Sequence, residues 1–297
     1  MQQELFSTIA NPISMLTSPI NVASVPHRSP FRYPGGKTWF IPSFRRWVKN
    51  LKVKPGLLIE PFAGGATIAL TSVCENLVDH AILIELDPDI SAVWQVLVAG
   101  DGPILAEKIL SFELTIENVK SELASPSFSL LDKAFKTILK NRTYHGGILA
   151  AGSGLIKSGE AGKGIASRWY PETLSKRLSS LHIIRNRLTV LCGDALSLSY
   201  PYLNDKKAIF FVDPPYTAGG KKAGKRLYTF SEISHVGLFD ICSKIEGDFV
   251  MTYDDTAEVY KLANEHDFDT RLIPMKNTHH ALMTELVIGR QLCWLDK

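Results

Sequence analysis

The chain has 297 residues, 45% hydrophobic and 21% charged, which is typical of a globular protein with one large core or two smaller ones. Its formal net charge is +3, and it has four widely spaced cysteines that form no C-x-x-C pair. This spacing excludes a disulfide framework and a cysteine-based zinc site, so we expect no metal and a reducing, cytoplasmic location.

The first 28 residues predict a flexible leader. The stretch from Leu5 to Pro26 carries no charge, but Pro12, Pro19 and many Ser, Thr and Asn residues interrupt it. Such a stretch is a poor membrane span, and Glu4 stands where a signal peptide would be positive. We therefore expect neither membrane contact nor a secretory signal.

The segment RYPGGKT (32–38) ends like a phosphate-binding loop. The Walker pattern would require glycine at the position of Phe31, and no strand precedes the segment, which argues against nucleotide hydrolysis. The alternative is a Pro-Gly-Gly turn before a helix, with Lys37 merely exposed.

The segment LLIEPFAGGATIAL (57–70) predicts a buried strand, a glycine-rich turn and a helix. Glycines let the backbone approach a ligand closely, and the helix N-terminus adds a favourable dipole. A second strand is predicted at 81–86, followed by a helical pattern through 91–98. Asp87 ends this strand 23 residues after Gly64, where a nucleoside site places the carboxylate that binds ribose hydroxyls.

The interval 101–188 predicts a mostly helical insertion rich in positive charge. Between Lys133 and Arg187 there are eleven Lys or Arg residues and two acids, and GGKKAGKR (219–226) adds a second basic run. Such segregation indicates a protein that presents basic segments to a polyanion. A solvated helical surface remains the alternative.

Further strands are predicted at 187–195, 208–216, 248–255 and 284–290. Apolar strands that alternate with helices indicate a mostly parallel sheet with helices on both faces. The carboxyl ends of such strands share one rim of the sheet, where ligands bind. Acids follow five of the strands and should converge there: Glu60, Asp87, Asp194, Asp213 and Asp254.

The tetrapeptide Asp213-Pro214-Pro215-Tyr216 follows the apolar strand AIFFV. The two prolines fix the backbone and remove two donors, which leaves carbonyl groups free to face a ligand. The Asp213 carboxylate and the Pro214 carbonyl can then accept both hydrogens of an amino group, while Tyr216 offers a flat face to a base.

YPGGK (33–37), EPFAGG (60–65), the strand-end acid and DPPY (213–216), in this order, resemble the Dam-like (D12 class) family of adenine-N6 DNA methyltransferases. The resemblance covers roughly residues 30 to 290 and extends to further segments: NRTYHGGIL (141–149), RWYPETLSKRL (168–178), GDAL (193–196), YTF (228–230) and TELVI (284–288). One departure is Ala66, where the family often has another glycine.

The resemblance implies a Rossmann-like S-adenosylmethionine-dependent methyltransferase fold. The catalytic domain would comprise 29–100 and 189–297, and the insertion 101–188 would recognise the DNA target. It also implies S-adenosylmethionine contacts at these positions: Tyr33, Gly35, Lys37, Glu60, Phe62, Gly64, Asp87, Asp194 and Asp213. The catalytic residues would be Asp213, Pro214, Pro215 and Tyr216.

The expected reaction is direct transfer of a methyl group to adenine N6 in double-stranded DNA, after the base is flipped out of the helix. Asn141, Arg142, Lys221 and Lys222 are candidate DNA contacts, although a structural role fits Asn141 and Arg142 equally well. We expect a monomer, and a cognate restriction endonuclease is an open partner. The alternatives are a cytosine-N4 methyltransferase and a catalytically inactive DNA-binding protein on the same fold.

Overall fold

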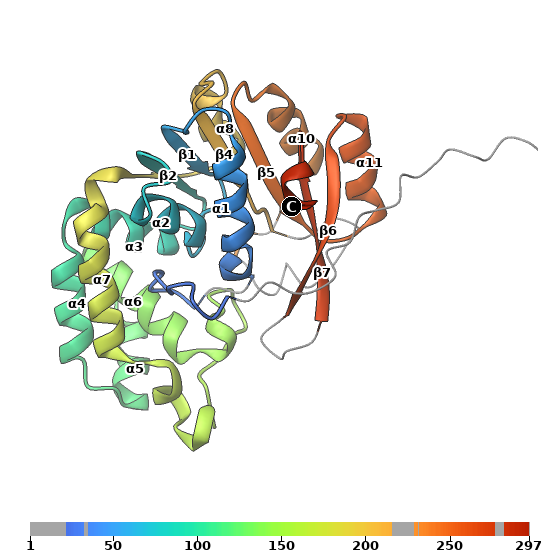
Figure 1. Cartoon of the computed structure of the whole chain (residues 1–297). Coiled ribbons are helices and arrows are strands. Elements are labelled where there is room, and N and C mark those ends of the chain that lie inside the picture. The colour runs from blue at the N-terminus through green and yellow to red at the C-terminus, as the bar shows by residue number, and fades with distance from the viewer. Residues whose placement is uncertain (1–21, 33–34, 216–228, 231, 277–281, 297) are drawn as a thin grey trace, which may run out of the picture.

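The computed structural model describes residues 22–32, 35–215, 229–230, 232–276 and 282–296. Among these residues, seven strands form one sheet in the order β3-β2-β1-β4-β5-β7-β6 (Figure 1). The strands are Leu57–Glu60 (β1), His80–Glu85 (β2), Leu188–Cys192 (β3), Ala208–Val212 (β4), Asp248–Tyr253 (β5), Asp269–Lys276 (β6) and Leu282–Gly289 (β7). Strands β1 to β5 pair in parallel, whereas β7 runs antiparallel to β5 and β6.

Helices cover both faces of this sheet. On one face lie Ile41–Asn50 (α1), Thr67–Cys74 (α2) and Pro88–Ala99 (α3); on the other lie Ala195–Ser199 (α8), His235–Lys244 (α10) and Ala257–Glu265 (α11). Because the strands β1, β2, β4 and β5 are buried on both sides, their sequences are mostly apolar rather than alternating. This doubly wound arrangement confirms the predicted Rossmann-like fold class, a mostly parallel sheet with helices on both faces.

The segment between α3 and β3 is the predicted helical insertion. Its α-helices are Gly102–Ser111 (α4), Ile116–Ala124 (α5), Leu130–Thr143 (α6) and Pro171–Ile184 (α7). Helix α6 packs on α3 and α7 on α4, and their buried side chains join the cluster that covers one face of the sheet. The insertion is thus continuous with the core, and its separate role in target recognition stays a prediction. None of the described helices is long and apolar enough to cross a membrane.

Two sequence predictions about local structure need correction. Strand β6 was missed, because Pro274 lies within it; the strand tolerates this proline since it forms the edge of the sheet. The leader is not free up to residue 28, because Val25 is buried in the core and Arg28 forms a 3.1 Å ion pair with Glu75. Residues 1–21 lie outside the described ranges.

The strand order also locates a crevice. From β1 the chain proceeds outward to β2 and β3, and then returns to place β4 on the other side of β1. Connections that diverge in this way leave space beyond the carboxyl ends of the two central strands. Glu60 ends β1 and Asp213 follows β4, so both lie at this crevice.

Candidate active site

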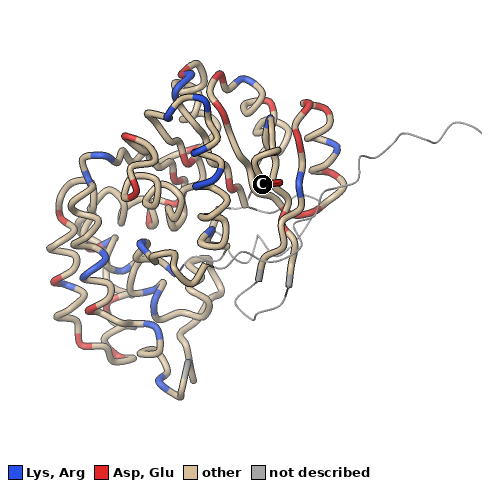
Figure 2. Tube along the Cα trace, in the orientation of Figure 1, with Lys and Arg blue, Asp and Glu red and all other residues tan. Residues whose placement is uncertain are grey.

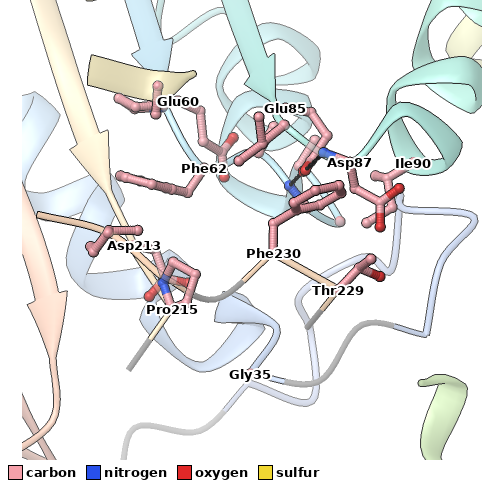
Figure 3. A pocket seen from close by; sticks show the side chains of 18 of the residues that line it. Gly35, Glu60, Phe62, Glu85, Asp87, Ile90, Asp213, Pro215, Thr229 and Phe230 are labelled. Atoms are coloured by element: carbon pink, nitrogen blue, oxygen red, sulfur yellow. Dashed lines mark hydrogen bonds between the residues drawn. The ribbon is translucent and has the colours of Figure 1, made fainter. Parts of the chain in front are cut away.

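A cavity of about 270 Å³ lies at this rim of the sheet (Figure 3). Its walls come from the glycine segment before α1, the loops that follow β1, β2, β3 and β4, and the segment 229–234. Four of the five predicted strand-end acids line it, namely Glu60, Asp87, Asp194 and Asp213. Asp254 is not among the lining residues, so the prediction of convergence holds for the other four.

The loop between β1 and α2 forms one wall of the cavity. Phe62 lines the cavity, and Gly64 adopts a positive φ of 45°. Ala66 immediately before α2 also has a positive φ of 49°, a conformation that costs an L-residue roughly 1–2 kcal/mol. This strain explains physically why glycine would suit the position of Ala66.

Glu60 is a buried carboxyl group beneath this loop. Its Oε2 accepts a 2.8 Å hydrogen bond from the Ala69 N–H in the first turn of α2. Burial, reinforced by the charge of Asp213, raises the pKa of Glu60 to about 8. Glu60 is therefore mostly protonated at neutral pH and adds little negative charge to the cavity.

Glu85 is a cavity residue that the sequence reading missed. It is the last residue of β2, and its carboxylate accepts hydrogen bonds from the N–H groups of Gly64 (2.8 Å) and Asp87 (2.9 Å). Burial raises the pKa of Glu85 to about 7. The predicted strand 81–86 places Glu85 inside the strand, whereas β2 ends at Glu85, one residue earlier.

Asp87 and Asp194 each cap a helix as well as lining the cavity. Asp87 accepts from the N–H of Asp89 at 2.9 Å at the start of α3, and Asp194 accepts from Ser197 at 2.7 Å at the start of α8. Such caps are a common role for aspartate after a strand. In each carboxylate one oxygen accepts the capping hydrogen bond. The predicted contacts of Asp87 and Asp194 with a cofactor stay predictions.

The Asp213 carboxylate is held on both oxygens. Thr252 of β5 donates to Oδ1 at 2.8 Å, and the Lys37 ammonium lies 2.9 Å from Oδ2. Pro214 is buried and Pro215 lines the cavity. The structure therefore places Asp213 and Pro215 in the same cavity as Phe62 and Asp87.

Lys37 corrects the alternative that it is merely exposed. The side chain is only 4% exposed, and its Nζ also contacts the Gly35 carbonyl at 2.9 Å and the Glu285 carboxylate at 3.1 Å. The ammonium is thus bound to groups of the protein. Lys37 also lines the cavity, so its contact with a cofactor stays a prediction. Gly35 lines the cavity as well.

Asn141 and Arg142, two of the candidate DNA contacts, have buried side chains. Asn141 is fully buried and exchanges hydrogen bonds with the backbone N–H and carbonyl of Arg32, at 2.9 and 3.0 Å. Arg142 is 4% exposed and donates to the Pro30 carbonyl. Both side chains fasten the segment before the glycine turn, so the structural alternative is the one that the structure supports.

Several predicted residues lie outside the described ranges, namely Tyr33, Tyr216, Lys221 and Lys222. Conversely, Phe230 points into the cavity although no role was predicted for it (Figure 3). In the sequence, Phe230 is marked only by its place in the segment YTF (228–230), which is part of the family resemblance. Among the described residues, no group of three or more His, Cys, Asp or Glu side chains is arranged to hold a metal ion.

Comparisons with known proteins find similarity in structure only. No family model and no curated protein sequence matches the chain. One similar solved structure is the rRNA methyltransferase aviRa from Streptomyces viridochromogenes, with 13% identity over 86% of this chain and 85% of that one, at a TM-score of 0.39. Another is precorrin-6y C5,15-methyltransferase from Geobacter metallireducens, with 9% identity over 84% and 87% of the chains and a TM-score of 0.30. Substrate and cofactor must therefore be inferred from the site itself.

Proposed function

We propose that this chain is a DNA methyltransferase that transfers a methyl group from S-adenosylmethionine to the N6 amino group of adenine. The observation that carries the proposal is one shared cavity, which brings the corner at Asp213 and Pro215 to the glycine loop of Phe62 and Gly64. A nucleoside-type site and an amine-binding corner are thereby adjacent, as direct transfer between two bound molecules requires.

The residues around the cavity fit S-adenosylmethionine. Gly64 has no side chain and a left-handed backbone, so a ligand can approach the loop closely. Glu85 and Asp87 present buried carboxyl groups suited to ribose hydroxyls, and the Phe62 ring offers a flat apolar face. When bound, the cofactor supplies a methyl group on a positively charged sulfonium, which the acids at the rim favour electrostatically.

Asp213 would act on the target amine. The N6 lone pair of adenine is delocalised into the ring, so the free amine is a poor nucleophile. Hydrogen bonds from N6 to the Asp213 carboxylate and the Pro214 carbonyl localise that lone pair and stabilise the positive charge that develops on nitrogen. No covalent intermediate with the protein is needed, and stacking of the base on Tyr216 remains part of the proposal.

Arginines beside the cavity support a polyanionic substrate. The Arg32 side chain has no acceptor among the residues that the structure describes, and partial burial together with Arg168 lowers its pKa. The Arg32 carbonyl packs against Gly147, which lines the cavity. Basic positions are frequent in the second part of the insertion, where residues 133–187 hold eleven Lys or Arg and two acids (Figure 2). Phosphates of DNA would contact the Arg32 guanidinium while an extruded adenine enters the cavity.

Expression in methylation-free cells, followed by sequencing of their DNA for modified bases, tests the proposal. N6-methyladenine at a defined sequence is expected, and none with the matched variant Asp213→Asn. N4-methylcytosine without N6-methyladenine would establish the cytosine-N4 alternative. Unmodified DNA, together with no consumption of labelled cofactor on any DNA, would leave the inactive DNA-binding protein. A restriction endonuclease gene beside the gene for this chain would support that enzyme as a partner. Analytical ultracentrifugation tests the expected monomer.

A further inference from the structure

Glu285 is a buried acid that the proposed reaction does not yet use. It lies in β7, only 5% exposed, and its Oε1 is 3.1 Å from the Lys37 Nζ. A buried carboxylate destabilises the fold unless it is paired, so we looked for its partner and for a role of the pair. Its partner Lys37 is the residue that contacts Asp213.

The sheet places Glu285 on the same face as the catalytic carboxylate. Side chains two residues apart share a face, and Val287 packs in the same buried cluster as Phe211 and Val250. Glu285, Asp213 and Thr252 therefore extend from this one face of the neighbouring strands β7, β4 and β5. Because β7 is antiparallel, Glu285 reaches the rim at which β4 and β5 end.

Lys37 joins these groups from above the face. Its ammonium has three hydrogens, and three acceptors surround it: the Gly35 carbonyl at 2.9 Å, Asp213 Oδ2 at 2.9 Å and Glu285 Oε1 at 3.1 Å. Three fixed acceptors from three separate segments define both the position and the orientation of the ammonium. The oxygen of Asp213 that it contacts is fixed in turn.

We propose that Glu285 is a positioning residue for methyl transfer, which acts on Asp213 through Lys37. The inference rests on the proposed function. Glu285 supplies the third anchor of the ammonium, so that Asp213 is held ready for the incoming amine. It also adds a second carboxylate beside the lysine charge.

The charge balance gives this arrangement a catalytic consequence. Lys37 with Asp213 alone would form a neutral pair, whereas Lys37 with two carboxylates carries a net charge of −1. Positive charge develops on the amine as the methyl group arrives, and a net negative group nearby favours that charge more than a neutral pair does. Glu285 is the second carboxylate that the structure places against the Lys37 ammonium, at 3.1 Å, beside Asp213 at 2.9 Å.

The test compares Glu285→Gln and Glu285→Asp with the wild-type protein in single-turnover methyl transfer to adenine-containing DNA. For Glu285→Gln we expect the rate to fall about tenfold or more, less than the hundredfold or greater losses typical of groups that touch the transition state. The Kd for S-adenosylmethionine and the KM for DNA should stay within about twofold, because Glu285 would act on the chemical step. Glu285→Asp keeps the charge and should recover part of the rate.

Asp248→Asn is the matched control, because Asp248 is a half-buried acid of the same sheet that accepts a hydrogen bond from Trp47 at the opposite end of β5. It should keep the wild-type rate. Fluorescence of 2-aminopurine placed at the target base, which lacks the N6 amine, should report the same base extrusion in Glu285→Gln as in wild type. Extrusion that is lost together with the rate would indicate a general structural role and overturn the proposal.

A wild-type rate in Glu285→Gln would overturn the inference, as would equal rates in the Gln and Asp variants. If Glu285→Gln does not fold, the double variant Lys37→Met with Glu285→Gln removes both charges and leaves no unpaired ammonium. In this variant Asp213 keeps the net charge of −1 but loses the anchored ammonium that positions it, so the rate should still fall. A wild-type rate in the double variant would overturn the proposal. Failure of the wild-type protein to methylate adenine would instead reject the proposed function.

Discussion

The backbone N–H of Gly64 donates a 2.8 Å hydrogen bond to the Glu85 carboxylate. This contact fastens the glycine loop after β1 to the end of the neighbouring strand β2. The second oxygen of the same carboxylate accepts from the Asp87 N–H, so one side chain shapes both loops that line the cavity. Glu85 rather than Asp87 therefore occupies the central position among these acids.

Replacement of Glu85 should weaken cofactor binding more than replacement of Asp87. Glu85→Gln keeps the side-chain shape but replaces one acceptor oxygen with an N–H donor, which would face the N–H of Gly64 or Asp87. A buried donor left without an acceptor costs about 1–3 kcal/mol. We expect the affinity for S-adenosylmethionine, measured by titration calorimetry, to fall about tenfold or more. Asp87→Asn should cost less, because asparagine caps a helix about as well as aspartate does.

The matched pair separates two assignments. Both variants should unfold as cooperatively as wild type in a thermal scan, so that affinities compare folded proteins. A larger loss of affinity for Asp87→Asn than for Glu85→Gln would restore Asp87 as the main ribose-binding acid. Equally small losses of affinity in the two variants would show that the ribose does not bind at Glu85 and Asp87.

Much of this cavity follows from short-range patterns in the sequence. Apolar runs that end in acids indicated strands whose carboxyl ends meet, and the structure brings Glu60 and Asp213 together at the switch point of the sheet. The two prolines of 214–215 signalled a stiff corner there. These features depend on neighbours along the chain, which is why the sequence predicts them.

Long-range partners could not be read in the same way. Asn141 lies 109 residues from the Arg32 backbone that it binds, and Lys37 pairs with acids far along the chain. A polar side chain in a basic segment looks like a DNA contact until its burial is known. Only the packing of α6 against the segment before the glycine turn shows that Asn141 and Arg142 are internal.

The stability of the protein should depend on the ionisation of Glu60. Its pKa is about 8 in the folded protein against an ordinary value of 4.5, so the protonated carboxyl stabilises the fold fully below about pH 4.5. That contribution is lost as the pH rises through about 8. Between these values the unfolded chain releases the proton first, at up to about 1.4 kcal/mol of stability per pH unit.

Glu60→Gln carries no ionisable group and should lack this part of the pH dependence. Urea denaturation of both proteins at several pH values gives the difference in free energy of unfolding. That difference should change in favour of the Gln variant as the pH rises. A difference that stays constant across this range would mean that Glu60 ionises normally in the folded protein.

Arg32→Gln should weaken DNA binding without changing the methylated sequence. The guanidinium has no protein acceptor in the described structure, and each lost phosphate contact reduces the salt slope of log K by about 0.9. Fluorescence anisotropy with labelled duplex DNA at several salt concentrations measures both quantities. Lys54→Gln is the control, since Lys54 is exposed at the start of the sheet, far from the rim, and pairs with Asp79. Identical salt slopes for Arg32→Gln and wild type would place Arg32 outside the DNA interface.

Asp213→Asn should abolish methyl transfer while the cofactor still binds. The amide is close in shape to the carboxylate and can keep one contact with Lys37 or Thr252, but it lacks the charge that favours a positive amine. Removal of a group that acts only in the transition state lowers kcat and kcat/KM together, here by about 100-fold or more. Labelled methyl incorporation into DNA gives the rate, and calorimetry gives the cofactor affinity.

Because Lys37 retains Glu285 at 3.1 Å, its ammonium is not left without a carboxylate partner, and the variant should remain folded. Full activity in this folded variant would show that the carboxylate of Asp213 has no part in activating the amine.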